Sequence, residues 1–373
     1  MNNPTATTID RTIPPGFGRT NQAKACHRAP TYLFFANAMT LISPNTHSPL
    51  ARTGGLYPLL IHLALALVFM VVILSAYLRL AGSGLGCMDW PECYAVIKTK
   101  AGGSGSLAAM HLVPAWATVV HRLTASALGI AVIGITLMSI QRRKHPEQPV
   151  LLPIMILVLT ILLSLLGYKT PSPLLPWVTL CNLAGGMAML ALLWWLRQRS
   201  ASPVMVNKAH PRGLRLGALI GIVIIFIQIS LGAWVSANFA ATACTDIPGC
   251  GGEPWTAVSL RESFDLTRTL AVMPNGKVVT GTAEKVIHMF HRGGALVVLI
   301  YIVWLCWRAA RGDRLMRRTA VTLFVLVLLQ PLLGVTTIAM NLPIIAVTAH
   351  NAIAALLLLS AVNLFHHLAP TGK

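Results

Sequence analysis

Charge is scarce in this chain, and acidic charge most of all. Only 10% of the 373 residues are charged, and 10 Asp and Glu stand against 29 Lys and Arg. A soluble domain carries about a quarter charged residues, so the composition excludes an ordinary soluble protein. Hydrophobic residues make up 55% of the sequence. The composition therefore predicts an all-α polytopic membrane protein.

Apolar runs of about 18 residues or more are long enough to cross a membrane as helices. We expect eight membrane-spanning helices on this criterion. The runs lie near residues 57–78, 115–139, 150–168, 174–196, 215–236, 286–307, 319–339 and 343–365.

The formal net charge of +19 is typical of nucleic-acid binding proteins, but its distribution argues against that class. Lys and Arg gather in the second, fourth and sixth connections between the expected spans. By the positive-inside rule, these connections and both termini face the cytoplasm, as in a bacterial inner-membrane protein. We therefore expect contact with membrane lipid and no nucleic-acid partner. The basic residues concerned are Arg142, Arg143, Lys144, Arg197, Arg199, Lys208, Arg212, Arg215, Arg308, Arg311, Arg314, Arg317 and Arg318.

Residues 1–54 precede the first expected span and are rich in Asn, Thr, Pro and basic residues. No signal-peptide pattern with a cleavage site is evident there. We expect a disordered cytoplasmic extension, with a translation start at Met39 as the alternative.

Four of the seven cysteines form a repeated motif, C-x-D-x-P-x-C. Cys87 and Cys93 follow the first span, and Cys244 and Cys250 follow the fifth. A motif that recurs at corresponding points indicates an internal repeat. With four spans in each repeat, the halves are parallel, so we expect two four-helix bundles, at 55–200 and 201–373.

Both cysteine pairs are expected on the outer face, in an oxidising compartment, which favours two local disulfides. A zinc site is the first alternative, although these loops offer no well-spaced histidines to complete it. A redox-active thiol pair is the second, because a short loop can strain the bond. Cys26 and Cys306 are interpreted as free thiols.

Two histidines open spans of the second half at matching depth. His291 lies in E-K-V-I-H-M-F-H-R-G-G, together with His288 and Arg292, and His350 lies in V-T-A-H-N. A histidine inside a membrane span is costly and usually functional. Two of them on neighbouring helices can hold one metal ion or haem iron. The alternative is a hydrogen-bonded pair across two helices.

The first half repeats this pattern incompletely. His121 and Arg122 match His291 and Arg292, but V-T-L-C-N places Cys181 where His350 stands, followed by Asn182. The asymmetry predicts one permanent site and one exchangeable site, with His121 and Cys181 as candidate metal ligands of the latter.

The other polar residues carry weaker signals. Arg79, just beyond the first span, is a candidate partner for an anionic group such as a propionate. Arg122 and Arg292 are candidates for the same role, or else interfacial anchors. The histidines interpreted as packing, solvent or interfacial residues are His62, His111, His366 and His367.

From about residue 56 to 366, these features resemble the haem A synthase family. The resemblance rests on G-S-G-L-G-C-M-D-W-P-E-C-Y after the first span, H-R opening the second and sixth, and a histidine opening the eighth. It implies an oxidoreductase that converts the C8 methyl of haem O to a formyl group for cytochrome oxidase assembly. It also implies a haem B held by His291 and His350, and a haem O site at His121 in the first half. A haem O synthase and an electron-transfer protein are the implied partners.

The sequence departs from that family at two positions. Thr118 stands where members commonly carry Glu, three residues before the first H-R histidine, and Cys181 or Asn182 replaces a second histidine. A threonine does not accept protons at neutral pH as a carboxylate does. The competing functions are a cytochrome b-like or quinol-linked electron carrier, and a transporter with broken helices near mid-membrane.

Overall fold

The computed structural model describes residues 55–82, 115–145, 148–169, 174–200, 212–247, 249–251, 255–274 and 276–368. The regular elements within these ranges are helices, joined by loops that include one isolated bridge between Val272 and Val278. Eight of the helices are long and apolar enough to cross a membrane. The predicted all-α, multi-pass membrane fold is confirmed. The predicted extension at 1–54 lies outside the described residues.

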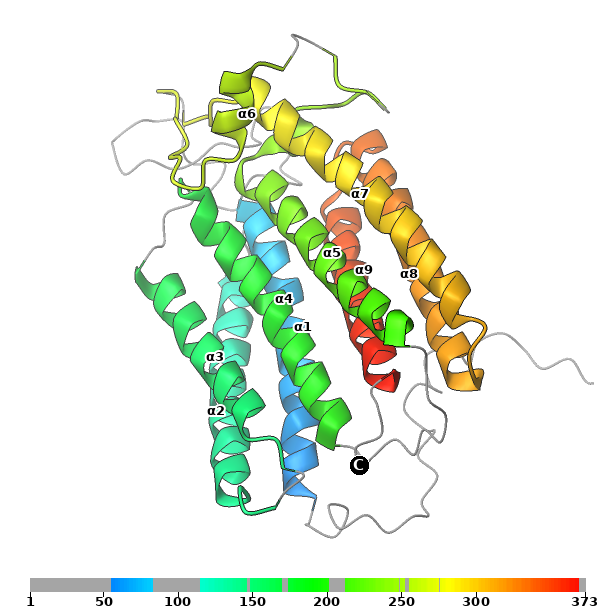
Figure 1. Ribbon diagram of the computed structural model, residues 1–373. Coiled ribbons are helices and arrows are strands. Elements are labelled where there is room, and N and C mark those ends of the chain that lie inside the picture. Colours follow the sequence, from blue (N-terminus) through cyan, green and yellow to red (C-terminus); the bar gives the residue numbers. More distant parts are fainter. Residues whose placement is uncertain are drawn as a thin grey trace, which may run out of the picture. The chain divides into compact units, whose positions relative to one another are not determined.

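The eight long helices follow the predicted order (Figure 1). A 3-10 turn, η3, and a short helix, α6, interrupt the connection between α5 and α7. The elements are α1 Leu56–Gly82, α2 Ala115–Gln141, α3 Leu151–Lys169, α4 Pro176–Ser200, α5 Arg212–Ala237, η3 Ala240–Thr242, α6 Ala257–Ser263, α7 Thr282–Ala309, α8 Arg314–Ala339 and α9 Ile344–His367.

Two helices extend beyond their apolar runs, and both extensions matter for the site. Arg79, predicted just beyond the first span, lies in the last turn of α1, because helix formation continues past the end of an apolar run. At the start of α7, the Glu284 carboxylate accepts a hydrogen bond from the backbone N–H of Gly281 at 2.6 Å. This capping contact starts the helix four residues before the predicted position.

The helices contact one another in two rings. In the first half, α1 contacts α2 and α4, and α3 contacts both of those helices. In the second half, α5 contacts α7 and α9, and α8 contacts both of those helices. Along the seam, α4 contacts α5 and α9, while α1 contacts α9. Each of the long helices is continuous, and α8 runs through Pro331 without a break, unlike the broken helices expected of a transporter.

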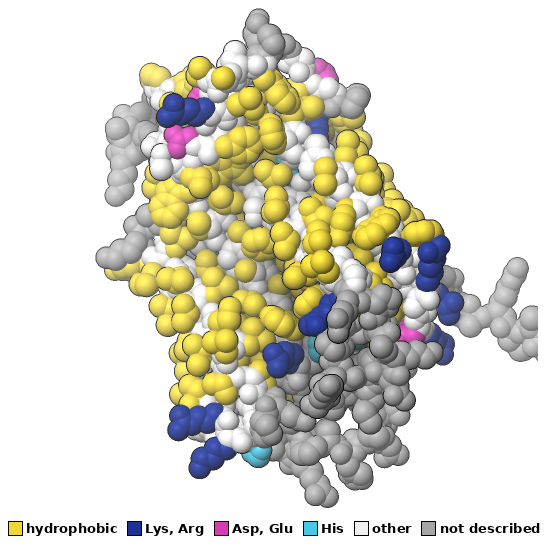
Figure 2. Space-filling model, viewed as in Figure 1, with side chains coloured by type: hydrophobic (Ala, Val, Ile, Leu, Met, Phe, Trp, Pro, Cys, Tyr) yellow, Lys and Arg dark blue, Asp and Glu magenta, His cyan; other side chains and the backbone are white. Residues whose placement is uncertain are grey.

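The outward faces of the helices are apolar, as a lipid environment requires. On α2, Leu123, Ile130 and Leu137 are spaced by seven residues and are 66%, 73% and 56% exposed. Figure 2 shows hydrophobic side chains along the helices, with Lys and Arg near the helix ends. Inward-facing residues such as Ile61 and Leu305 are almost fully buried. The same sequence periodicity therefore separates a lipid face from a packed core.

Candidate functional site

A cavity of about 610 Å³ lies among the helices of the second half. It falls within the usual size range of ligand pockets, about 300–1,000 Å³. Side chains of α5, α7, α8 and α9 form most of its wall, and Arg79 and Leu80 of α1 and Met187 of α4 line it as well. Ala241 and Ile247, from the connection between α5 and α7, also line it. The wall is mostly apolar, with a few polar groups that can fix the orientation of a ligand.

His291 on α7 and His350 on α9 both line this cavity. The structure therefore brings together the two histidines that the sequence singled out. Gly232 of α5 lies against the His291 ring, where an added Cβ would stand 3.0 Å from Cε1. The absence of a side chain at this position lets the imidazole lie directly against the α5 backbone.

Each of these histidines is contacted by a glutamine from a neighbouring helix. Gln228 Nε2 lies 3.0 Å from Nδ1 of His291 and donates to the backbone oxygen of His291 at 2.8 Å. Gln330 Nε2 donates to the backbone oxygen of His350 at 3.2 Å. The sequence analysis assigned no role to either glutamine. The signal that could have found them is the cost of placing an amide inside a membrane helix.

His288, one turn before His291, also lines the cavity and is only 5% exposed. Helix α7, which carries His288, contacts η3 of the outer connection. This contact joins α7 to the outer connection at the rim of the cavity.

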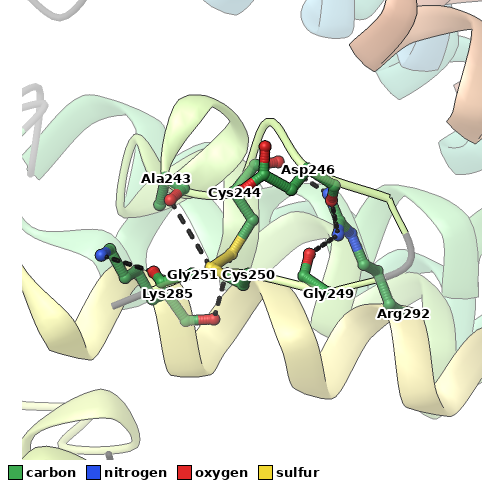
Figure 3. Close-up of a disulfide and its surroundings, with 8 residues drawn as sticks. All are labelled: Ala243, Cys244, Asp246, Gly249, Cys250, Gly251, Lys285 and Arg292. Atoms are coloured by element: carbon green, nitrogen blue, oxygen red, sulfur yellow. Dashed lines mark hydrogen bonds between the residues drawn. A yellow bond between two sulfur atoms is a disulfide. The ribbon is translucent and has the colours of Figure 1, made fainter. Parts of the chain in front are cut away.

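Arg292 holds the outer loop that follows α5. Its guanidinium donates to the backbone oxygens of Cys244 and Asp246 at 2.6 Å and of Gly249 at 2.7 Å (Figure 3). A disulfide joins Cys244 to Cys250 within this loop, which is the pairing that the motif predicts. A planar guanidinium with several donors is suited to bind converging carbonyl groups. Arg292 therefore links the disulfide loop to the helix that carries His291.

A buried ion pair secures the same connection further along. Arg268 contacts the Glu284 carboxylate at 2.8 Å, and Glu284 is 2% exposed. Trp234 donates its indole N–H to the backbone oxygen of Ser263 at 2.8 Å. These contacts attach α6 and the loop after it to the outer ends of α5 and α7.

We predict that replacing both Cys244 and Cys250 with Ser lowers the free energy of unfolding by about 2 kcal/mol, because a short closed loop loses its constraint on the unfolded chain. Thermal unfolding of the purified protein measures the change. Mass mapping of unreduced peptides checks the pairing, and two free thiols at these positions would contradict it. Replacement of Cys306, a buried free thiol, with Ser is the matched control for the Cys-to-Ser change itself. The predicted Cys87–Cys93 pair lies outside the described residues.

In the first half, His121 is half-buried and its Nε2 lies 2.7 Å from Oγ of Ser75 on α1. Arg122 is exposed, and Thr118 is half-buried one turn before His121. Cys181 is an exposed free thiol at the start of α4.

Three histidines interpreted as peripheral, His62, His366 and His367, are described by the structure and do not line the cavity of the second half. His62 is exposed and its Nδ1 lies 2.7 Å from its own helix at Pro58 O. His366 and His367 lie in the last turn of α9. Cys26 and His111 lie outside the described residues.

Comparison with known proteins identifies the family to which the chain belongs. The COX15-CtaA family model, described as cytochrome oxidase assembly protein, matches residues 58–362. A heme A synthase of Shewanella oneidensis is 31% identical over 319 residues, which cover 83% of this chain and 96% of that protein. A heme A synthase of Shouchella clausii is 24% identical over 287 residues, covering 73% and 83% of the two chains. The chain belongs to the haem A synthase family of cytochrome oxidase assembly proteins.

Proposed function

We propose that this protein is a haem A synthase, an oxidoreductase that converts the C8 methyl of haem O to the formyl group of haem A. The observation that carries the proposal is the cavity in which His291 and His350 meet, within a chain of this family. Conversion of a methyl to a formyl group replaces two hydrogens with one oxygen and removes four electrons. Such a reaction requires an electron acceptor, and this requirement accounts for a redox cofactor in the same molecule.

The cofactor that the second half fits is haem B, which His291 and His350 would hold through its iron. The cavity is large and apolar enough to bury a porphyrin, and two histidines from different helices reach it. His350 Nδ1 is buried without a hydrogen-bond partner among the described residues. A haem with two histidine ligands supplies one-electron transfer and has no open position for oxygen.

The other polar residues around this cavity bind the haem or shield it from water, and take no part in the reaction itself. Arg79 provides a positive charge in the cavity wall, suited to a haem propionate. Arg292 was a candidate for the same role, and it binds the backbone oxygens of the disulfide loop. We propose that its main task is to hold this loop at the outer end of the cavity, where it limits access of water.

We propose that the first half binds haem O, with His121 as its iron ligand. A single strong ligand suits a substrate that must leave after turnover, whereas two suit a resident cofactor. Ser75 orients the His121 ring through its hydroxyl. Thr118 has no carboxylate to accept protons, so another group must take those released from the methyl. Cys181 or Asn182 faces the opposite side of the substrate iron in this proposal.

The internal repeat supports this division of roles. We propose that residues 55–200 and 201–373 are parallel repeats, since α1 to α4 and α5 to α9 contact one another in equivalent rings. By the same proposal, the even connections and both termini are cytoplasmic, in a bacterial inner membrane. Both haem sites then lie toward the outer face, beneath the disulfide loops. Haem O synthase and an electron-transfer protein are the proposed partners.

Pigment analysis tests the proposed function. The protein is purified after co-expression with a haem O synthase, and its haems are extracted and separated. We expect haem B together with haem O or haem A, and accumulation of haem A in the membranes. Haem B alone, with no haem A formed, would instead indicate an electron carrier. A protein that contains no haem would contradict both functions.

A further inference from the structure

We infer that Gln228 is the positioning residue of His291: its side-chain amide sets the ring orientation and proton position of that ligand, and through them the redox potential of the cofactor. The inference rests on the proposed function, because it concerns the haem that His291 would hold. Gln228 lies on α5 and His291 on α7, two helices in direct contact.

The geometry holds the imidazole at two points. Gln228 Nε2 reaches both Nδ1 and the backbone oxygen of His291. A side chain that is hydrogen-bonded to both the ring and the backbone of a histidine restrains rotation of the ring about its side-chain bonds. Because Gln228 occupies Nδ1, the other ring nitrogen, Nε2, would be the one left to hold iron.

Glycines on both helices make room for this contact. A Cβ at Gly232 would crowd His291 Cε1, and a Cβ at Gly294 would overlap Oε1 of Gln228. Gln228 and Gly232 are four residues apart, and His291 and Gly294 are three apart, so each pair lies on one helix face. The two faces therefore interlock, and the space that each glycine leaves is filled by the side chain from the other helix.

The amide has a second, unused hydrogen-bonding group. Gln228 Oε1 is buried and has no hydrogen-bond partner among the described residues. When Nε2 of a neutral imidazole binds iron, the ring proton must reside on Nδ1, which then needs an acceptor. A half turn of the amide places Oε1 where Nε2 stands. This turn would satisfy the unpaired oxygen and supply the acceptor, and it would give up the bond from Nε2 to the His291 backbone oxygen in exchange.

His350 provides an internal comparison. Gln330 approaches it in a similar way but donates to its backbone oxygen, and no bond from Gln330 to the His350 ring is found in this part of the structure. The two candidate ligands therefore differ in their hydrogen-bonded surroundings. A hydrogen bond from Nδ1–H makes an imidazole a stronger electron donor and favours ferric iron. Gln228 should then lower the potential, and Gln330 should not act through the ring.

The test is a redox titration of the haem-loaded, full-length protein. Gln228→Leu should raise the midpoint potential and weaken haem retention about tenfold. If the tenfold loss of affinity applies to the ferric haem alone, the midpoint potential shifts by about 59 mV for a one-electron couple. Gln228→Glu keeps the shape and provides a stronger acceptor, so it should lower the potential. Gln330→Leu, the matched control, should shift the potential less than Gln228→Leu does.

Gly294→Ala gives an independent test without changing the glutamine. The added methyl displaces the Gln228 amide, so the potential should rise as in Gln228→Leu. Gly213→Ala, on α5 where no heavy atom lies within 4 Å of the added carbon, is the control for a Gly-to-Ala change in a helix.

Equal potentials in wild type, Gln228→Leu and Gln228→Glu would overturn the inference while leaving the proposed function intact. Equal shifts in the Gln228 and Gln330 variants would overturn it as well, because contact with the ring would then have no special effect. A wild-type protein that binds no haem B would refute the proposed function itself. If Gln228→Leu fails to fold, Gln228→Glu and Gly294→Ala still decide the question by their opposite shifts.

Discussion

Replacement of His291 or His350 with Ala is expected to abolish the low-spin absorption bands of bound haem B. Both histidines line the same cavity, from α7 and α9. A low-spin haem of this kind needs a strong ligand on each side of the iron, and an Ala variant retains only one. Loss of a ligand therefore changes the spectrum even where some haem remains bound. Absorption spectra of the purified variants, with haem content measured by extraction, provide the readout.

His62→Ala is the matched control for this experiment. His62 also lies in a membrane helix, but it is exposed and its ring is close to its own helix at Pro58. Its replacement should leave both haem content and spectrum at wild-type levels. An unchanged low-spin spectrum in either His291→Ala or His350→Ala would show that this residue is not a ligand. The alternative of two histidines that only stabilise helix packing would then apply.

The second large effect is expected at His121, in the first half. His121→Ala should retain the haem B spectrum and stop the conversion of haem O to haem A. The reason is that His121 lies on α2, outside the ring of α5, α7, α8 and α9 that forms most of the wall of the cavity proposed to hold haem B. Removal of the principal substrate ligand should reduce conversion at least tenfold. Haem extraction from membranes that contain a haem O synthase measures the ratio of haem O to haem A.

A substitution at Ser75 tests the same site with a smaller expected effect. Ser75→Ala removes the hydroxyl 2.7 Å from His121 Nε2 and should lower conversion less than His121→Ala does. Ser164→Ala is the control, because the Ser164 hydroxyl donates to its own helix at Thr160 O. Loss of haem B in His121→Ala, or haem A formed at the normal rate, would contradict the division of roles between the halves. In the second case the first half would hold lipid instead of substrate.

Part of this site could be predicted from the sequence because the membrane imposes strong constraints on it. A histidine within an apolar run is rare enough to be noticed, so His291 and His350 were identified before any contact was known. The paired cysteines were recognisable for a similar reason, since the motif that holds Cys244 and Cys250 recurs in the chain. Local spacing carried enough information in both cases.

The supporting contacts could not be predicted in this way. Gln228 is 63 residues from His291, and Arg292 is 48 residues from Cys244. Nothing in the spacing of an apolar run indicates which of its faces meets a given neighbour. Arg292 was a candidate partner for an anionic group or an interfacial anchor; its side chain lines the cavity, and its guanidinium also binds backbone oxygens of a loop. A charged residue in the sequence indicates which kind of group it can bind, but it does not indicate which partner the fold places within reach.

The sequence by itself determined the number and order of the membrane helices and the spacing of the disulfide, and it singled out the two histidines that line the cavity of the second half. These features follow from the cost of exposing polar groups to lipid, which acts on each segment separately. Only the tertiary structure decided that Arg79 of the first half lines the cavity of the second, that Gln228 contacts the His291 ring and that Arg292 secures the loop. These contacts depend on how helices rotate and approach one another, and that is settled by the packing of many side chains at once.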